Sequence, residues 1–226
     1  MYPGVPPAVS FDPMFLMLLP VFVFSVIVHE CAHGLAALWC GDPTARDQGR
    51  ITLNPLPHVH PWGSIVLPLA LALAHSPVLL GWAKPVPVNP ANFRDPRNGP
   101  VWVALAGPAS NAVLAVCAAG LATLAPTGGY FAPLRELAIA AVVINLALGL
   151  FNLIPIPPLD GSWVLMRFLR LRHILVLHQF RWVGMVAVAA LLSFPATSGP
   201  LVERPLRAAA TGLLGLFGIA GAGGLL

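Results

Sequence analysis

The sequence predicts an all-α polytopic membrane protein, built as a bundle of about 4–6 transmembrane helices. The 226-residue chain is 58% hydrophobic and only 9% charged, and its mean hydropathy is +0.82. Several apolar runs approach or exceed the roughly 20 residues that a helix needs to cross a bilayer. Segments rich in proline separate these runs. Because a soluble domain of this length needs far less apolar surface, we expect most of the chain to lie in or near lipid.

Three runs are the clearest spans. The first extends from residue 14 to about residue 40, where Gly41-Asp42-Pro43 has the residue order expected after a helix end. The second, residues 101–125, is rich in the small residues that let helices approach closely. The third covers residues 134–154 and leads into Pro155-Ile156-Pro157-Pro158-Leu159-Asp160-Gly161, which predicts a broken helix.

The other segments are less regular. Residues 42–62 are broken by prolines, and we expect a short hairpin around residues 50–53. Residues 63–82 either cross the bilayer or enter it and return on the same side. Residues 162–182 form either a basic amphipathic helix at the membrane surface or basic flanks of another span. The remaining stretches are a proline-rich loop at 83–100, a short apolar run at 183–194 and a final apolar segment at 206–226.

Length and charge give the domain organisation and exclude one class of partner. We expect a single membrane-embedded domain over residues 1–226, with its core at about 14–170 and additional membrane segments at 171–226. The formal charge is +4 and the pI is near 9.5. Since the basic residues lie between apolar runs, they indicate orientation in the membrane, and no nucleic-acid partner is expected. The three cysteines include no C-x-x-C pair and predict no disulfide framework.

The first apolar run contains the pattern His29-Glu30-Cys31-Ala32-His33. Residues four apart lie on one face of a helix, so His29 and His33 can offer two imidazole nitrogens to one metal ion. Glu30 is turned by about 100° from His29 and can take a proton from a water molecule beside the metal. Ionisable groups at this depth are costly and indicate function. The alternative is a polar cluster that only joins helices.

Asp160 is the candidate for a third metal ligand. Catalytic zinc usually has three protein ligands and one open position. Most other acidic residues lie in polar, proline-flanked or Arg-flanked segments, whereas Asp160 lies between long apolar stretches, after three prolines and before Gly161. Irregular backbone at membrane depth occurs only where it faces protein or a wet cavity. The alternative is that Asp160 caps the N-terminus of the following helix, and one carboxylate can do both.

The two motifs, His29-Glu30-Cys31-Ala32-His33 and Asn152-Leu153-Ile154-Pro155-Ile156-Pro157-Pro158-Leu159-Asp160-Gly161, together resemble the site-2 protease family of intramembrane zinc metalloproteases. The stretches 81–90 and 107–111 are similar to further motifs of a compact bacterial and archaeal branch. The resemblance covers about residues 14–170. We expect no PDZ or CBS regulatory domain, because 226 residues leave no room for one.

The resemblance implies a zinc metalloendopeptidase with one zinc ion per chain, bound by His29, His33 and Asp160, with Glu30 as the catalytic base. It implies hydrolysis of peptide bonds in membrane-spanning or membrane-associated protein substrates, in a bacterial or archaeal cell membrane. Asn152 is our candidate for binding substrate backbone or an oxyanion; its alternative role is hydrogen bonding between helices. His58 and His60 are either extra ligands or substrate contacts, or ordinary loop histidines near the interface.

A helical substrate must unwind before its peptide bond can be attacked, because its backbone groups are bonded internally. Residues 42–62 and 83–92 lack helix signals, so we expect them to pair with the unwound strand.

The two metal motifs must meet at one depth. If the first and third spans are parallel, residues 101–125 provide the return crossing, and residues 63–82 re-enter rather than cross. Both basic segments, 42–62 and 83–100, then lie on the cytoplasmic side, as does the active site. The alternative is that residues 63–82 cross the bilayer completely and that one more segment crosses it fully or partly.

One different function uses the same residues. A polytopic ion or metal transporter could employ the buried His, Glu and Asp side chains as an ion path, since broken helices and buried ionisable groups are common in transporters. The sequence indicates neither the physiological substrate nor the oligomeric state.

Overall fold

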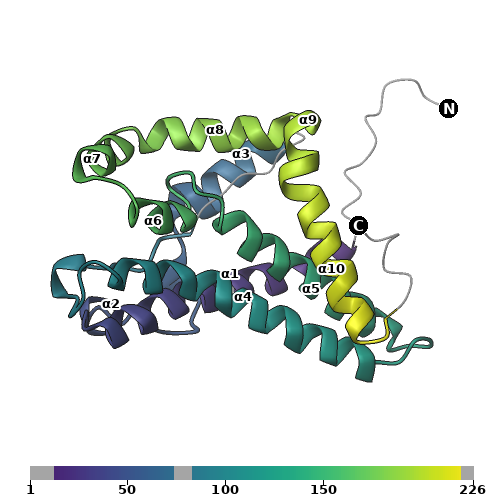
Figure 1. The fold of residues 1–226 in the computed structure, drawn as a ribbon. Helices are drawn as coiled ribbons and strands as arrows, with labels where there is room; N and C mark the ends of the chain where they lie inside the picture. Colours follow the sequence, from purple (N-terminus) through teal and green to yellow (C-terminus); the bar gives the residue numbers. More distant parts are fainter. Residues whose placement is uncertain (1–12, 74–82, 220–226) are drawn as a thin grey trace.

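The computed structural model describes residues 13–73 and 83–219, in which all regular secondary structure is helical (Figure 1). Because no strand occurs within these ranges and residues 50–53 are irregular, the short hairpin expected around residues 50–53 is not formed. The α-helices are α1 (Pro13–Cys40), α2 (Thr44–Asp47), α3 (Leu67–Leu73), α4 (Gly99–Leu124), α5 (Ala132–Asn152), α6 (Gly161–Met166), α7 (Leu171–Gln179), α8 (Arg181–Ser193), α9 (Pro195–Ser198) and α10 (Arg204–Leu216). Two 3-10 turns, η1 (Leu56–His58) and η3 (Pro90–Asn92), and two π turns, η2 (Pro61–Val66) and η4 (Gly199–Glu203), complete the set.

Three helices in the described ranges are long and apolar enough to cross a membrane. They are Met17–Cys40 within α1, Gly99–Leu124 and Ala132–Asn152. A fourth crossing is present if Trp182–Ser193 and Ala196–Leu216 count as one span, although these two are bent by 97°. The sequence prediction of a polytopic helical membrane protein is confirmed, at the lower end of the expected helix number.

Helices α1, α4 and α5 form the core, and side-chain contacts fix their directions. His33 contacts Val103 near the start of α4, whereas His29 contacts Asn111 further along, so α1 and α4 are antiparallel. Asn111 also donates a hydrogen bond to Asn145, and Gly149 packs against Pro108, so α5 is antiparallel to α4. Helices α1 and α5 are therefore parallel, as the sequence analysis favoured. The structure leaves the path of residues 63–82 open, because residues 74–82 lie outside the described ranges.

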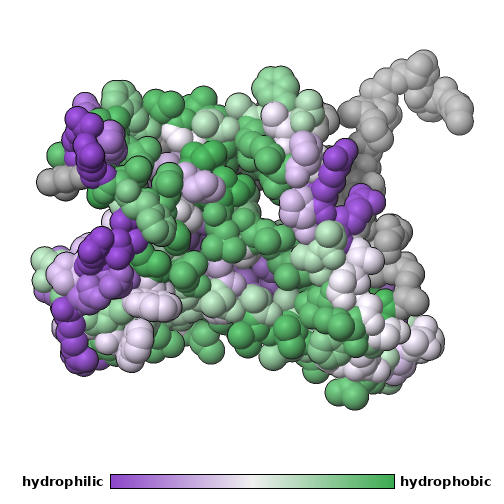
Figure 2. Space-filling view, viewed as in Figure 1, coloured by the Kyte–Doolittle hydropathy of each residue, from purple (hydrophilic) through white to green (hydrophobic). Residues whose placement is uncertain are grey.

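The helix contacts differ at the two ends of the bundle. At one end, small residues of α4 pack on α5 and α10 and form an alanine-rich core; its buried members are Ala115, Ala118, Ala119, Ala122, Ile139, Val142, Leu214 and Ile219. At the other end, Ala37, Phe93 and Val103 form a smaller cluster where α1 ends and α4 begins. The face shown in Figure 2 is largely apolar. Hydrophilic residues gather at the end that carries α2 and α7, on the left, and a smaller group lies beside α10, on the right. This distribution suits a protein that is embedded in lipid.

Candidate metal centre

His29 and His33 lie on the face of α1 that packs against α4. Both are buried, with exposed fractions of 7% and 9%. Their Nε2 atoms are 3.0 Å apart and the two rings meet edge to face. The four-residue spacing thus brings the imidazoles together, as expected for one turn of helix.

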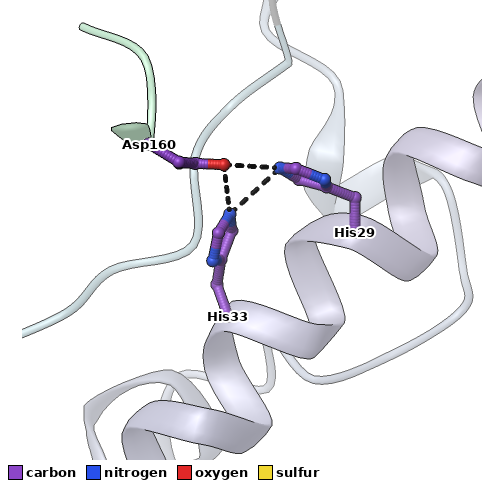
Figure 3. A group of neighbouring side chains, drawn as sticks. All are labelled: His29, His33 and Asp160. Carbon is purple, nitrogen blue, oxygen red and sulfur yellow. Dashed lines mark hydrogen bonds and ion pairs between the residues drawn. The ribbon is translucent and has the colours of Figure 1, made fainter. Parts of the chain in front are cut away.

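Asp160 reaches the same point from the loop between α5 and α6. Its Oδ2 is 3.1 Å from Nε2 of His29 and 3.3 Å from Nε2 of His33 (Figure 3). Asp160 occupies the N-cap position of α6, but its side chain makes no capping hydrogen bond. Helix capping, the alternative role considered from the sequence, is therefore not what the carboxylate does here. The carboxylate is directed sideways at the two imidazoles.

The outer nitrogen of each imidazole meets a hydrogen-bond acceptor. Nδ1 of His29 lies 2.6 Å from Oδ1 of Asn111, and Nδ1 of His33 lies 2.7 Å from the carbonyl oxygen of Val103. An acceptor at Nδ1 requires the proton there, which leaves the Nε2 lone pair free in a neutral ring. The Nε2 lone pairs of His29 and His33 and the Oδ2 atom of Asp160 then lie at hydrogen-bond distance from one another. None of these three atoms carries a hydrogen that it could donate to the others.

This arrangement fits a zinc ion. A tetrahedral zinc ion with bonds of about 2.0–2.1 Å holds its ligand atoms roughly 3.3 Å apart. The three distances between Nε2 of His29, Nε2 of His33 and Oδ2 of Asp160 are 3.0, 3.1 and 3.3 Å. Oδ2 is also buried without a conventional hydrogen-bond donor. A cation between these atoms would satisfy all three, and His, His and carboxylate are the ligand types of catalytic zinc.

A chain of amides supports His29 from the other two core helices. Asn111, on α4, is fully buried and donates from Nδ2 to Oδ1 of Asn145 on α5, at 3.0 Å. Asn145 in turn donates to the carbonyl of Ala141, at 2.9 Å. The sequence analysis gave Asn111 and Asn145 no role. Burying an Asn side chain in an apolar span costs free energy unless the amide is hydrogen-bonded. The presence of these two Asn residues in apolar runs was therefore the sequence signal for such a role.

Two glycines make room for the centre. A Cβ atom on Gly107 would lie 2.5–2.6 Å from ring atoms of both His29 and His33, so only glycine lets α4 pass this close. A Cβ atom on Gly161 would lie 2.2 Å from the carbonyl oxygen of Leu153. Gly161 ends the stretch expected to be a broken helix, and its role in the structure is close backbone contact. Its φ is not among the positive values found in the chain.

Glu30 follows His29 in α1, and its side chain reaches an extended segment before α4. Its Oε2 accepts a hydrogen bond of 2.8 Å from the backbone N–H of Val86. The carboxylate is partly exposed and does not belong to the three-ligand group. This placement beside the cluster, rather than within it, suits a proton acceptor better than a ligand.

The remaining candidates lie outside the cluster. Asn152, at the end of α5, donates from Nδ2 to the carbonyl of Leu148, at 2.9 Å, within its own helix. His58 is 3% exposed, and its Nε2 donates to the carbonyl of Thr52 at 2.9 Å, while its Nδ1 has no partner. His60 accepts the N–H of Gly63 and caps the turn that follows it. None of the three is in the metal-ligand group of the described residues.

Comparison with known proteins identifies the family of the chain. The family model for peptidase family M50 matches residues 129–194, which include Asp160. YwhC of Bacillus subtilis (strain 168), named as a zinc metalloprotease, is 40% identical over 156 residues, which cover 65% of this chain and 68% of that protein. Rip2 of Mycolicibacterium smegmatis (strain ATCC 700084 / mc(2)155), also so named, is 32% identical over 194 residues, covering 83% and 70%.

Rip2 of Mycobacterium tuberculosis (strain ATCC 25618 / H37Rv) is 29% identical over 194 residues, covering 84% of this chain and 71% of its own. No solved structure matches the chain at a significant level. The names of these relatives describe zinc metalloproteases, which supports the protease over the transporter considered from the sequence. The chain belongs to peptidase family M50, the site-2 protease family of membrane zinc metalloproteases.

Proposed function

We propose that this protein hydrolyses peptide bonds of membrane-spanning or membrane-associated protein substrates, with one zinc ion held by His29, His33 and Asp160. The observation that supports this ligand set is the convergence of three buried lone pairs with no donor among them. Zinc at this point would supply Lewis-acid chemistry, namely activation of water and polarisation of the scissile carbonyl.

Glu30 is the proposed general base. Its Oε2 is held by the N–H of Val86, which leaves the second carboxylate oxygen to take a proton from the attacking water. The same oxygen then delivers the proton to the departing amine, since the acid and base roles of one group alternate in amide hydrolysis. The site needs one base beside the metal, and Glu30 is the carboxylate adjacent to the His29–His33 pair in the chain.

The centre lies at membrane depth and toward one end of the bundle. At a rise of 1.5 Å per residue, His33 is about 10 Å and His29 about 16 Å from the end of α1 at Cys40. That end carries the polar segments between α1 and α4 and the residues after Asp160, and Arg167 joins the two by donating to Asn98 at 3.0 Å. Its basic residues include Arg46, Arg50, Lys84, Arg94, Arg97, Arg167, Arg170 and Arg172. Because cytoplasmic loops are enriched in Lys and Arg, we assign this end, and the active site, to the cytoplasmic side.

An extended segment beside Glu30 is the proposed platform for substrate. Residues 83–89 are irregular, with prolines at 85 and 87 that exclude helix. Val86 lies within this segment and contacts Glu30, so a substrate strand that pairs along it would pass close to the base. Residues 42–62 remain a second candidate for strand pairing.

Asn152 remains a candidate for binding the substrate backbone or an oxyanion. Its side-chain amide is bonded to Leu148 in the free enzyme, at 2.9 Å, so it must leave that partner to engage substrate. If Asn152 acts on substrate, Asn152→Ala should lower kcat more strongly than it lowers zinc content. If Asn152 only forms a hydrogen bond within its own helix, the substitution should change neither.

The function is tested with purified protein in detergent and a library of quenched-fluorescent transmembrane peptides. Wild type should cleave members of the library, lose activity with a chelator and recover it with zinc. Glu30→Gln should retain zinc and lose turnover. Asp160→Asn should lose zinc, whereas Asp95→Asn, on an exposed loop, should keep it. Full zinc content in Asp160→Asn, or turnover in Glu30→Gln, would reject the assigned roles.

A further inference from the structure

Arg50 is a buried cation without an acidic partner. It is 7% exposed, and within residues 13–73 and 83–219 no carboxylate lies at ion-pair distance from its side chain. Its Nη2 donates instead to two backbone carbonyls, those of Lys84 at 2.8 Å and Pro85 at 3.2 Å. Burying a guanidinium on carbonyls alone is costly, so its position requires an explanation other than stability.

The two carbonyls belong to the segment that touches Glu30. Prolines 85 and 87 have no N–H, so few donors are available to hold this segment. The N–H of Lys84 donates to the carbonyl of His58 and that of Val86 donates to Glu30, both at 2.8 Å. Arg50 therefore holds the carbonyl groups of Lys84 and Pro85. The N–H of the next residue, Val86, holds the carboxylate of Glu30.

Helix α1 has no side chain at Gly34, and this stretch packs closely against the helix there. A Cβ atom on Gly34, one turn after Glu30, would lie 3.1 Å from Cγ1 of Ile51 and 3.2 Å from Cγ1 of Val86. Ile51, the neighbour of Arg50, and Val86 therefore rest together on the same point of α1. The neighbour of Arg50 and the residue that binds Glu30 are thus packed against the same part of α1.

We propose that Arg50 is a positioning residue for Glu30. It anchors residues 84–86 by their carbonyls, and the Val86 N–H then holds Oε2 of Glu30 in a fixed direction. Arg50 is assigned no contact with zinc or substrate. The inference rests on the proposed role of Glu30 as base, and displacement of a reacting group by about 1 Å can cost on the order of 100-fold in rate.

The experiment compares Arg50→Met and Arg50→Lys in the peptide-cleavage assay, with kcat, KM and zinc content measured for each. Arg50→Met keeps the length of the side chain but has no donor, so kcat should fall about 10–100-fold while zinc content stays at the wild-type level. Arg50→Lys can reach one of the two carbonyls and should be intermediate. Arg46→Met is the matched control, because Arg46 is exposed and its ion pair among the described residues is with Asp47. It should behave as wild type.

A second pair of variants tests the route through Val86. Val86→Pro removes the N–H that holds Glu30, and Val86→Ala keeps it while reducing the packing on Gly34. If Arg50 acts through this N–H, adding Arg50→Met to Val86→Pro should lower kcat little further, whereas adding it to Val86→Ala should have its full effect.

Several results would overturn the inference while leaving the proposed function intact. The first is a wild-type kcat in Arg50→Met. The second is an Arg50→Met enzyme in which only KM changes. The third is an Arg50→Met enzyme that loses zinc in proportion to its loss of activity. Additive effects of Arg50→Met and Val86→Pro would overturn it as well. If Arg50→Met does not fold, Arg50→Lys decides, since reduced kcat with intact zinc supports the role and wild-type kcat rejects it. Failure of the proposed function is separate, because wild type itself would then not cleave or Glu30→Gln would remain active.

Discussion

Oδ1 of Asn111 lies 2.6 Å from Nδ1 of His29, so an amide on α4 sets the tautomer of an imidazole on α1. This contact spans 82 positions of the sequence and is buried on both sides. Outer partners of this kind orient a metal-binding histidine and raise its basicity.

Replacing Asn111 should therefore weaken zinc binding. Asn111→Ala removes the acceptor at Nδ1 and should lower zinc affinity about 10–100-fold, measured by competition with a chelating dye. Asn111→Asp keeps an acceptor oxygen and should bind zinc more tightly than Asn111→Ala. Equal affinity in all three proteins would mean that the Asn111 contact does not act on the ligand.

Gly107 should tolerate no side chain. Gly107→Ala places a Cβ atom 2.5 Å from Cε1 of His29, so α4 must move away or the rings must turn. Overpacking of this kind costs about 1–3 kcal/mol, and we expect a lower Tm in detergent together with reduced zinc content. Gly120→Ala is the matched control on α4, because the one atom of the described residues that its Cβ would meet is Cε1 of Phe217, at 3.7 Å. A zinc content unchanged in Gly107→Ala would contradict the close packing of α4 on the two rings.

Asp42 should make stability depend on pH. It is fully buried just after α1, and burial by itself would raise its pKa, but hydrogen bonds from Thr44, Asn89 and Asn92 outweigh burial and hold the pKa below the ordinary value. A carboxyl with a lowered folded-state pKa stabilises the fold above its unfolded-state pKa. That stabilisation is lost as pH falls through the folded-state pKa.

The measurement is Tm in detergent from pH 7 down to pH 3. Wild type should lose stability over the acidic part of this range, and Asp42→Asn should be less stable at pH 7 and flatter in its response. Asp47→Asn, at an exposed position on the same segment, should follow wild type. Parallel curves for wild type and Asp42→Asn would show that Asp42 is not the source of the acid sensitivity.

Blocking strand pairing at Val88 should slow cleavage without releasing zinc. Val88→Pro removes one N–H from the segment proposed to receive substrate, and we expect a severalfold rise in KM with unchanged zinc content. Val88 also packs at the end of α1, near Cys40, so Val88→Ala serves as the control for lost packing. An equal effect of both substitutions would assign the change to packing and not to pairing.

The sequence alone predicted those parts of the molecule that depend on local patterns. Three apolar runs gave the core helices, and the His29 to His33 spacing gave a shared helix face. Asp160 was selected because its surroundings differ from those of most other acidic residues, and the structure places it beside both imidazoles. Which of these side chains hold zinc and perform catalysis remains a proposal.

The parts that the sequence did not predict depend on distant contacts. Asn111 meets His29 only because α4 lies antiparallel to α1, and no local pattern carries this information. Gly161 leaves room for the carbonyl of Leu153, and no local pattern indicates this contact. Arg50 looked like an ordinary loop cation in a polar segment, and its burial appears only once residues 84–86 are folded over it.

The proposed ligands lie far apart along the chain, with the two histidines on α1 and the carboxylate in the loop after α5. At ribosomal rates of about 5–20 residues per second, roughly 6–25 s pass between synthesis of His33 and synthesis of Asp160. During this interval the nascent helix pair has both imidazoles but lacks the Asp160 carboxylate. With the proposed ligand set, the metal centre is therefore completed only after α5 has been made, when most of the chain has been translated.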